Sequence, residues 1–130
     1  MAALAAGCGG DGAAVDARLT FVVPDNNIRE EGAECAGARP FRAIHRGTVF
    51  TVEDEAGEVV AEGELPAGIA KNADPSIDWE DDLIPTVCTF EVEIGLPERD
   101  RYTVVLPEAV PLRLDRSAIG DEPVQLVLVG

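Results

Sequence analysis

The sequence predicts an all-β domain, an antiparallel β-sandwich closed by one disulfide. Three observations support this fold class. Apolar and polar residues alternate in several short runs, residues that favour turns separate these runs, and two cysteines lie far apart in the body of the chain. A period of two residues is typical of a strand that buries one face. We expect one helical turn at most, over residues 115–120.

The first predicted strand covers residues 16–23, where apolar side chains recur at every second position. Residues 24–27, Pro-Asp-Asn-Asn, predict its end, because these residue types favour turns. The stretch 28–46 contains two Gly, one Pro and Cys35 without a sustained period. This pattern predicts an ordered loop held in place by the cysteine.

Residues 48–53 and 58–65 predict a β-hairpin. Both runs are rich in β-branched or apolar residues, and the acidic segment Asp54-Glu55-Ala56-Gly57 joins them. Residues 66–85 then turn to Pro, Gly, Asp and Asn. A connection of that length inside a compact domain is usually functional or mobile.

Alternation resumes in the last third of the chain, where Cys88 falls on the core face of a predicted strand. The runs with this pattern cover residues 88–94, 102–106, 110–114 and 124–128, and prolines stand at their boundaries. Six or so short strands with regular turns are typical of a small barrel or of a sandwich, such as the immunoglobulin-like and transthyretin-like kinds.

The composition predicts one domain and limits the classes of partner that this domain can bind. Hydrophobic residues make up 46% of the 130 residues but aromatic residues only 5%, so the predicted core is lean and consists mainly of Val, Leu, Ile and Ala. The formal net charge is -15. A protein of this sign cannot release counterions from a phosphate backbone, so nucleic acid is excluded as a partner. Electrostatic attraction to anionic lipid is disfavoured for the same reason.

The beginning of the chain, Leu4-Ala5-Ala6-Gly7-Cys8, resembles the lipobox of bacterial lipoproteins, and Gly-rich sequence follows it. Small residues let the segment enter the signal peptidase, and the thiol accepts diacylglycerol. The resemblance implies a signal remnant and flexible tether over residues 1–15 and lipid on Cys8. The alternating runs place the sandwich domain in residues 16–130. Ala5 stands where the family prefers Leu, and none of the seven residues before Cys8 is basic. Either the true start lies upstream of Met1, or the segment is an Ala/Gly-rich terminus.

The odd number of cysteines suggests separate roles. If Cys8 carries lipid, Cys35 and Cys88 remain as one pair, at positions that could meet across the fold. A bond between them closes a loop over 53 sequence positions and contributes about 4 kcal/mol on the chain-entropy model. We therefore expect a structural disulfide formed in an oxidising compartment.

About half of the chain also resembles small exported or lipoprotein domains of uncharacterised role from GC-rich Gram-positive, actinobacterial-type bacteria. The residues that carry this resemblance are Cys35, the run 44–65, Cys88-Thr89-Phe90 and the run 97–102. The resemblance implies an exported β-sandwich with one disulfide. It implies no activity and no catalytic residues.

One segment has the composition of a ligand site. Five carboxylates cluster in it: Asp74, Asp78, Glu80, Asp81 and Asp82. Oxygen ligands of this kind suit Ca²⁺, yet the spacing matches no EF-hand loop, so a solvated acidic loop is the alternative. Trp79, the only Trp, lies in the same segment. It is a candidate anchor for a protein partner, or a plug over the edge of the sandwich.

These patterns predict an exported, lipid-anchored protein on the extracytoplasmic face of the cell membrane, or a secreted one. We expect a non-enzymatic binding or accessory module that needs no cofactor, meets the membrane through Cys8 and binds an envelope protein. A calcium-dependent module using residues 74–82 is the alternative. A second alternative is an envelope hydrolase using carboxylates such as Asp78 and Glu80. His45 is the only histidine, which leaves no second imidazole for a zinc site.

Overall fold

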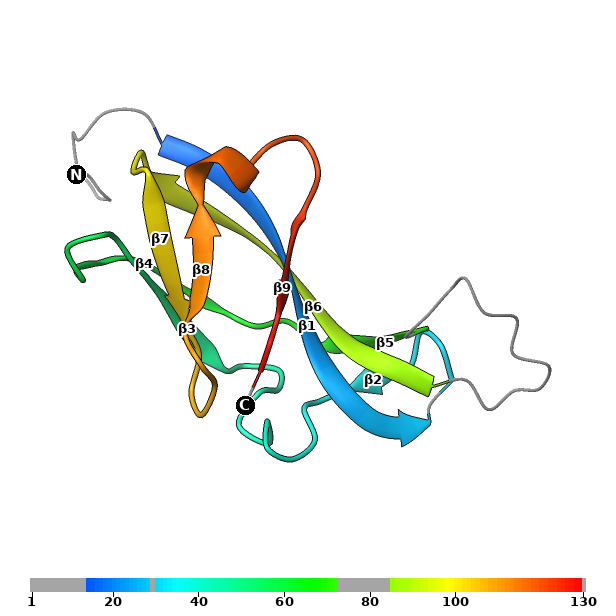
Figure 1. Ribbon diagram of the computed structural model, residues 1–130. Coiled ribbons are helices and arrows are strands. Elements are labelled where there is room, and N and C mark those ends of the chain that lie inside the picture. Colours follow the sequence, from blue (N-terminus) through cyan, green and yellow to red (C-terminus); the bar gives the residue numbers. More distant parts are fainter. Residues whose placement is uncertain (1–13, 29, 73–84, 130) are drawn as a thin grey trace.

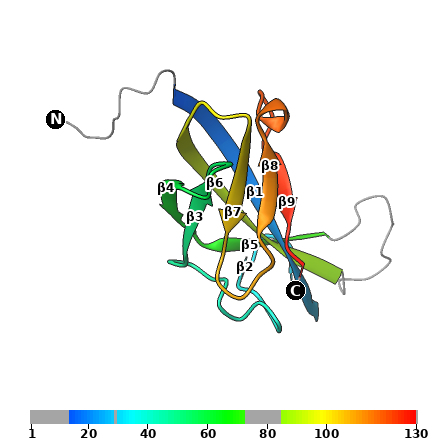
Figure 2. The same cartoon turned by 60° about the vertical axis from the view of Figure 1, so that its left-hand side comes forward.

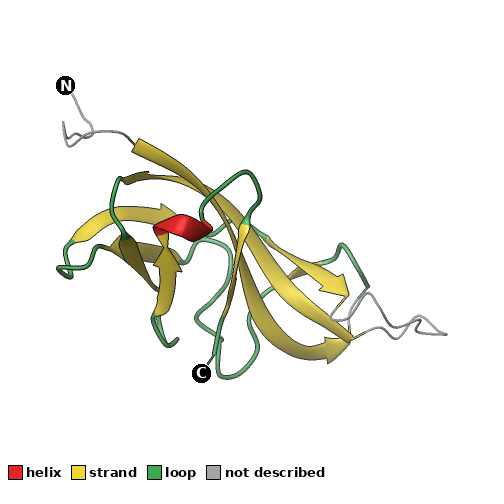
Figure 3. Cartoon of the chain, turned by 45° about the horizontal axis from the view of Figure 1, so that its top comes forward, coloured by secondary structure: helices red, strands yellow, loops and turns green. Residues whose placement is uncertain are grey.

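Two β-sheets pack against each other in the computed structural model, which describes residues 14–28, 30–72 and 85–129 (Figure 1). One sheet has five strands in the order β2-β5-β6-β1-β9, and the other has four in the order β4-β3-β7-β8. Figure 3 shows strands and their connecting loops in the described parts of the chain, together with a short helical turn. The prediction of an all-β sandwich is confirmed.

The five-stranded sheet is built around a long antiparallel pair, β1 (Ala14–Ile28) and β6 (Pro85–Pro97). On one side of this pair lie β5 (Gly68–Asn72) and then the two-residue strand β2 (Glu34–Cys35). On the other side, β9 (Val124–Val127) runs parallel to β1. Among the described strands, this parallel pair is the one departure from the predicted antiparallel arrangement.

The four-stranded sheet contains the predicted hairpin, β3 (Val49–Glu53) and β4 (Val59–Glu64). Strand β7 (Arg101–Val105) pairs with β3, and β8 (Leu112–Asp115) pairs with β7. The 3-10 turn η2 (Arg116–Ala118) follows β8 and lies within the stretch where one helical turn was expected. Figure 2, turned to another side, shows this sheet beside the long β1 and β6 strands of the other sheet.

The core between the sheets contains the Phe and Tyr side chains, which are few in this sequence. All four Phe are buried, as is the only Tyr. Phe21 of β1 and Phe50 of β3 meet edge to face with ring centroids 5.2 Å apart. Such a pair adds stabilisation beyond the burial of its area. Aliphatic side chains fill the rest of the core, as predicted.

The predicted disulfide between Cys35 and Cys88 is present, with 5.8 Å between the two Cα atoms. It ties β2 to β6, although β5 lies between these two strands. Gly68 of β5 makes this possible, because a Cβ atom there would lie 2.6 Å from the Cys88 sulfur and 2.7 Å from the Phe90 ring. The bond therefore fastens the short edge strand β2 to the centre of its sheet.

A tyrosine corner closes the turn from β6 to β7. The buried Tyr102 hydroxyl donates to the Pro97 carbonyl at 2.6 Å and accepts the Arg99 backbone N–H at 3.1 Å. Burial raises the pKa of Tyr102, so the hydroxyl keeps its proton at neutral pH. A Tyr that bonds back to the backbone at the start of a strand is a hallmark of immunoglobulin-like sandwiches.

Four details of the predicted strands are wrong. Strand β1 does not end at Pro24 but continues to Ile28, with irregular pairing to β6 in between. Strand β5 lies in the stretch read as a long connection, and β2 lies in the stretch read as a loop. Val110, placed in an alternating run, is 49% exposed. For the three strands, pairing with a neighbouring strand decides the outcome, and local composition does not report that pairing. Val110 precedes β8, which begins at Leu112.

Candidate functional site

Most of the site residues predicted from sequence lie outside the described part of the chain. This applies to Cys8, to the carboxylates of the 74–82 segment and to Trp79. Lipidation, calcium binding, partner binding through Trp79 and hydrolysis through Asp78 and Glu80 therefore remain predictions. Among the described residues, no three His, Cys, Asp or Glu side chains are grouped to hold a metal ion. No helix in those same residues is long and apolar enough to cross a membrane.

His45, the only histidine of the sequence, lies on the surface. Its side chain is exposed, and Nδ1 lies 2.8 Å from the carbonyl oxygen of the adjacent Arg46. The Arg46 guanidinium in turn donates to Glu34 at 3.0 Å. These contacts are those of a solvated loop.

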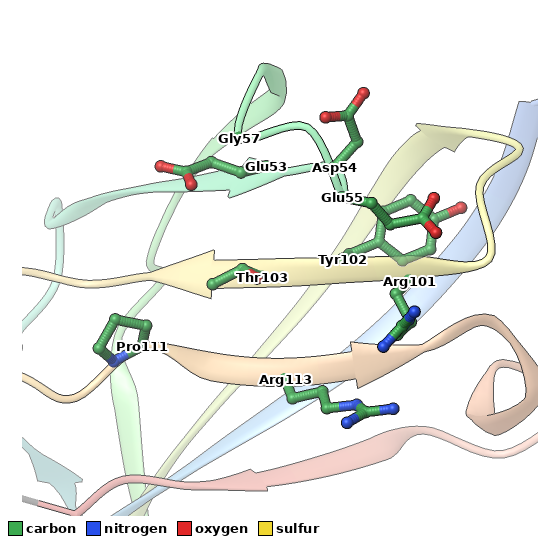
Figure 4. A pocket seen from close by; sticks show the side chains of 9 residues that line it. All are labelled: Glu53, Asp54, Glu55, Gly57, Arg101, Tyr102, Thr103, Pro111 and Arg113. Carbon is green, nitrogen blue, oxygen red and sulfur yellow. The ribbon is translucent and has the colours of Figure 1, made fainter.

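The outer face of the four-stranded sheet is hollowed by a concavity of about 550 Å³, which we call the β3–β7–β8 concavity (Figure 4). Its volume lies within the range of small-ligand sites in proteins. The residues that line it are Glu53, Asp54, Glu55, Gly57, Arg101, Tyr102, Thr103, Pro111 and Arg113. Acidic side chains stand on the β3 side and arginines on the β7 and β8 side.

Strand register explains how these charges come together. Glu53 of β3 pairs with Thr103 of β7, and Thr103 pairs with Arg113 of β8. The three residues form one row across the sheet, on the face opposite to the buried Val104 and Leu112. Neighbouring strands lie about 4.8 Å apart, so the Cα atoms of Glu53 and Arg113 are roughly 10 Å apart. An acid, a hydroxyl and a guanidinium therefore follow each other across the concavity.

The acidic wall is held by Asp54 at the start of the hairpin turn. Its Oδ1 accepts the backbone N–H groups of Ala56 and Glu58 at 2.9 and 3.1 Å, and its Oδ2 accepts from the Arg99 guanidinium at 3.3 Å. The Glu58 N–H is the main reason that the pKa of Asp54 lies below its usual value. The positive charge of Arg99 balances the negative charge of Asp54. The remaining negative charge on this side of the concavity is that of Glu53 and Glu55.

The opposite wall carries Arg113 and Arg101. Arg113 pairs with Asp115 at 2.8 Å while remaining largely exposed. In the described part of the chain, the side chain of Arg101 has no hydrogen bond or ion pair. A second concavity of about 500 Å³ borders both arginines and reaches Arg116, which pairs with Glu98 at 2.7 Å. Three arginines therefore lie at this corner, with Asp100 and Asp115 beside them.

Sequence reasoning did not identify the β3–β7–β8 concavity. The available signal was the alternation that places Arg113 on the outward face of the predicted run 110–114, with Arg101 directly before the predicted run 102–106. Sequence alone does not show that β7 lies between β3 and β8, which is what places Glu53 opposite Arg113. The combination defines a disulfide-braced β-sandwich with a surface concavity of mixed charge. Comparison of the chain with protein-family models, curated proteins and solved structures finds no match.

Proposed function

We propose that this protein is an exported cell-envelope protein, anchored by lipid on Cys8, that acts as a non-enzymatic binding or accessory module. The observation that carries the proposal is the disulfide between Cys35 and Cys88. Disulfides persist in oxidising compartments and are rare where thiol-reducing systems operate. The lipobox-like sequence before Cys8 supports attachment to the membrane.

The β3–β7–β8 concavity supports a binding role. It lies on paired strands, and the contacts of Asp54 brace one of its walls. Side chains carried by a rigid sheet lose little conformational freedom when a ligand binds. A ligand or partner would meet a prearranged pattern of charge.

The direct test is mass spectrometry of the protein purified from the envelope of the cells that produce it. We expect a mature chain that begins with diacylglycerol-modified Cys8, and a linked peptide pair that contains Cys35 and Cys88. A Cys8→Ala variant serves as the control, and it should leave the membrane fraction while keeping its disulfide. A chain found in the cytoplasm with an unmodified Cys8 and two free thiols would refute the proposal.

The binding role has a separate test. Capture of envelope proteins by the wild type is compared with capture by a variant with Arg101→Gln and Arg113→Gln. An Arg39→Gln and Arg42→Gln variant carries the same charge change at exposed positions outside the concavity. We expect a partner that is lost only with the concavity variant. Equal capture by all three proteins would exclude the concavity as the binding surface.

A further inference from the structure

We propose that the β3–β7–β8 concavity binds a short peptide with a free amino group and a free carboxylate. The peptide carboxylate lies against Arg101 and Arg113, and its ammonium group lies against Glu53 on the opposite side of the concavity (Figure 4). This ligand assignment rests on the binding function proposed above and adds a chemical class to it.

The two arginines of the concavity indicate that its ligand carries an anionic group. The chain has 25 acidic and only 10 basic residues, yet two of its arginines line this one concavity, opposite its acidic residues. Arg113 shares its charge with Asp115, whereas Arg101 has no partner among the described residues. A guanidinium offers paired donors that match the two oxygens of a carboxylate. The corner of the concavity near β7 and β8 is therefore suited to a carboxylate.

The acidic wall excludes a ligand that carries negative charge alone. Glu53 makes no ion pair or side-chain hydrogen bond with the described residues, and Glu55 stands exposed at the rim. A purely anionic ligand would be repelled by these carboxylates, and a purely cationic ligand by the arginines. A ligand with both charges is attracted at both ends, so the site discriminates by repulsion as well as by attraction.

The width of the site favours a peptide of about three residues. The Cα atoms of Glu53 and Arg113 are two strand spacings apart, roughly 10 Å. An extended chain covers at most about 3.3–3.6 Å per residue, so three residues span this distance. Thr103 lies between the two charged residues, as Figure 4 shows, and its hydroxyl can donate to or accept from a peptide group in the middle of the ligand.

The experiment is calorimetric titration of the full, oxidised chain with trialanine, N-acetyl-trialanine and trialanine amide. We expect trialanine to bind, and each blocked peptide to bind at least about tenfold more weakly, because each lacks one charge-assisted contact. Arg101→Gln and Glu53→Gln should each weaken trialanine binding to a similar extent. Arg42→Gln, a change of the same charge at an exposed position outside the concavity, should leave it unchanged.

Each other outcome overturns the assignment. If trialanine does not bind, the ligand class is wrong. If trialanine and its amide bind equally, the arginines do not recognise the carboxylate of the peptide. If trialanine and N-acetyl-trialanine bind equally, the site does not recognise the ammonium group and binds a simple anion. Because the mass of the native N-terminus tests export independently, a lipidated Cys8 together with a negative titration would refute the ligand and leave the export proposal standing.

Discussion

Loss of the Cys35–Cys88 bond should remove a large share of the stability of this domain. The bond closes a loop over 53 sequence positions. On the chain-entropy model, freeing that loop in the unfolded state costs about 4 kcal/mol of folding stability. Domains of this size are stable by only about 5–15 kcal/mol in total. Reduction should therefore leave a domain that is folded marginally or not at all at 37 °C.

The assay is equilibrium unfolding in urea, followed by far-ultraviolet circular dichroism, with and without a phosphine reductant. For a slope of about 2 kcal/mol per molar urea, a loss of about 4 kcal/mol lowers the midpoint by about 2 M. The Cys8→Ala variant should show the same shift, which excludes bonds between chains through Cys8. A variant with Cys35→Ala and Cys88→Ala should unfold early and should not respond to the reductant.

The variant with Cys35→Ala and Cys88→Ala loses stability for a second reason, which the structure shows. Cys35 is 6% exposed and Cys88 is fully buried, so their replacement by Ala also removes packed sulfur atoms from the core. The double variant should therefore be less stable than the reduced wild type by roughly 1 kcal/mol. A midpoint that moves by less than about 0.5 M on reduction would refute the view that the bond braces a lean core.

Three further predictions test other parts of the fold. Tyr102→Phe should lower the free energy of unfolding by about 1–3 kcal/mol in urea, because two backbone groups lose the hydroxyl; an unchanged value would refute a structural tyrosine corner. Gly68→Ala should cost about 1–3 kcal/mol in the same assay through the clash of its Cβ with the Cys88 sulfur, whereas Gly120→Ala, with open space around it, should not. The pKa of Asp54 is lowered in the folded state, so the ionised carboxylate stabilises the fold. This contribution is complete above about pH 4, the usual Asp range, and is lost as the pH falls through the folded-state pKa. Wild type should thus lose more stability between pH 6 and pH 3 than Asp54→Asn, and parallel curves would contradict this.

Local pattern predicts the strands best where one face is buried and the other is solvated. In the β3–β4 hairpin, alternation, β-branched residues and an acidic turn ending in Gly57 all favour the same structure, and the hairpin forms as predicted. Strand β5 has only five residues, Gly68–Asn72, preceded by Pro66. It forms because it pairs with both β2 and β6, and a long-range pairing of this kind leaves no trace in its own composition.

The candidate site was less predictable than the fold. The calcium and partner hypotheses relied on a run of acidic residues and on Trp79, all close together in sequence. The β3–β7–β8 concavity instead combines residues about fifty positions apart, such as Glu53 and Thr103. Alternation shows that each of these side chains faces outward, but it does not show which strands are neighbours.

By itself, the sequence determined the all-β class, the position of most strands and the pairing of Cys35 with Cys88, because alternation and an odd set of cysteines are local or countable properties. Only the tertiary structure decided that β9 runs parallel to β1, that Gly68 lets the disulfide pass over β5, and that acidic and basic walls face each other across β7. The physical reason is that strand order and register arise from contacts between distant segments, and the residues of one segment do not encode its neighbours.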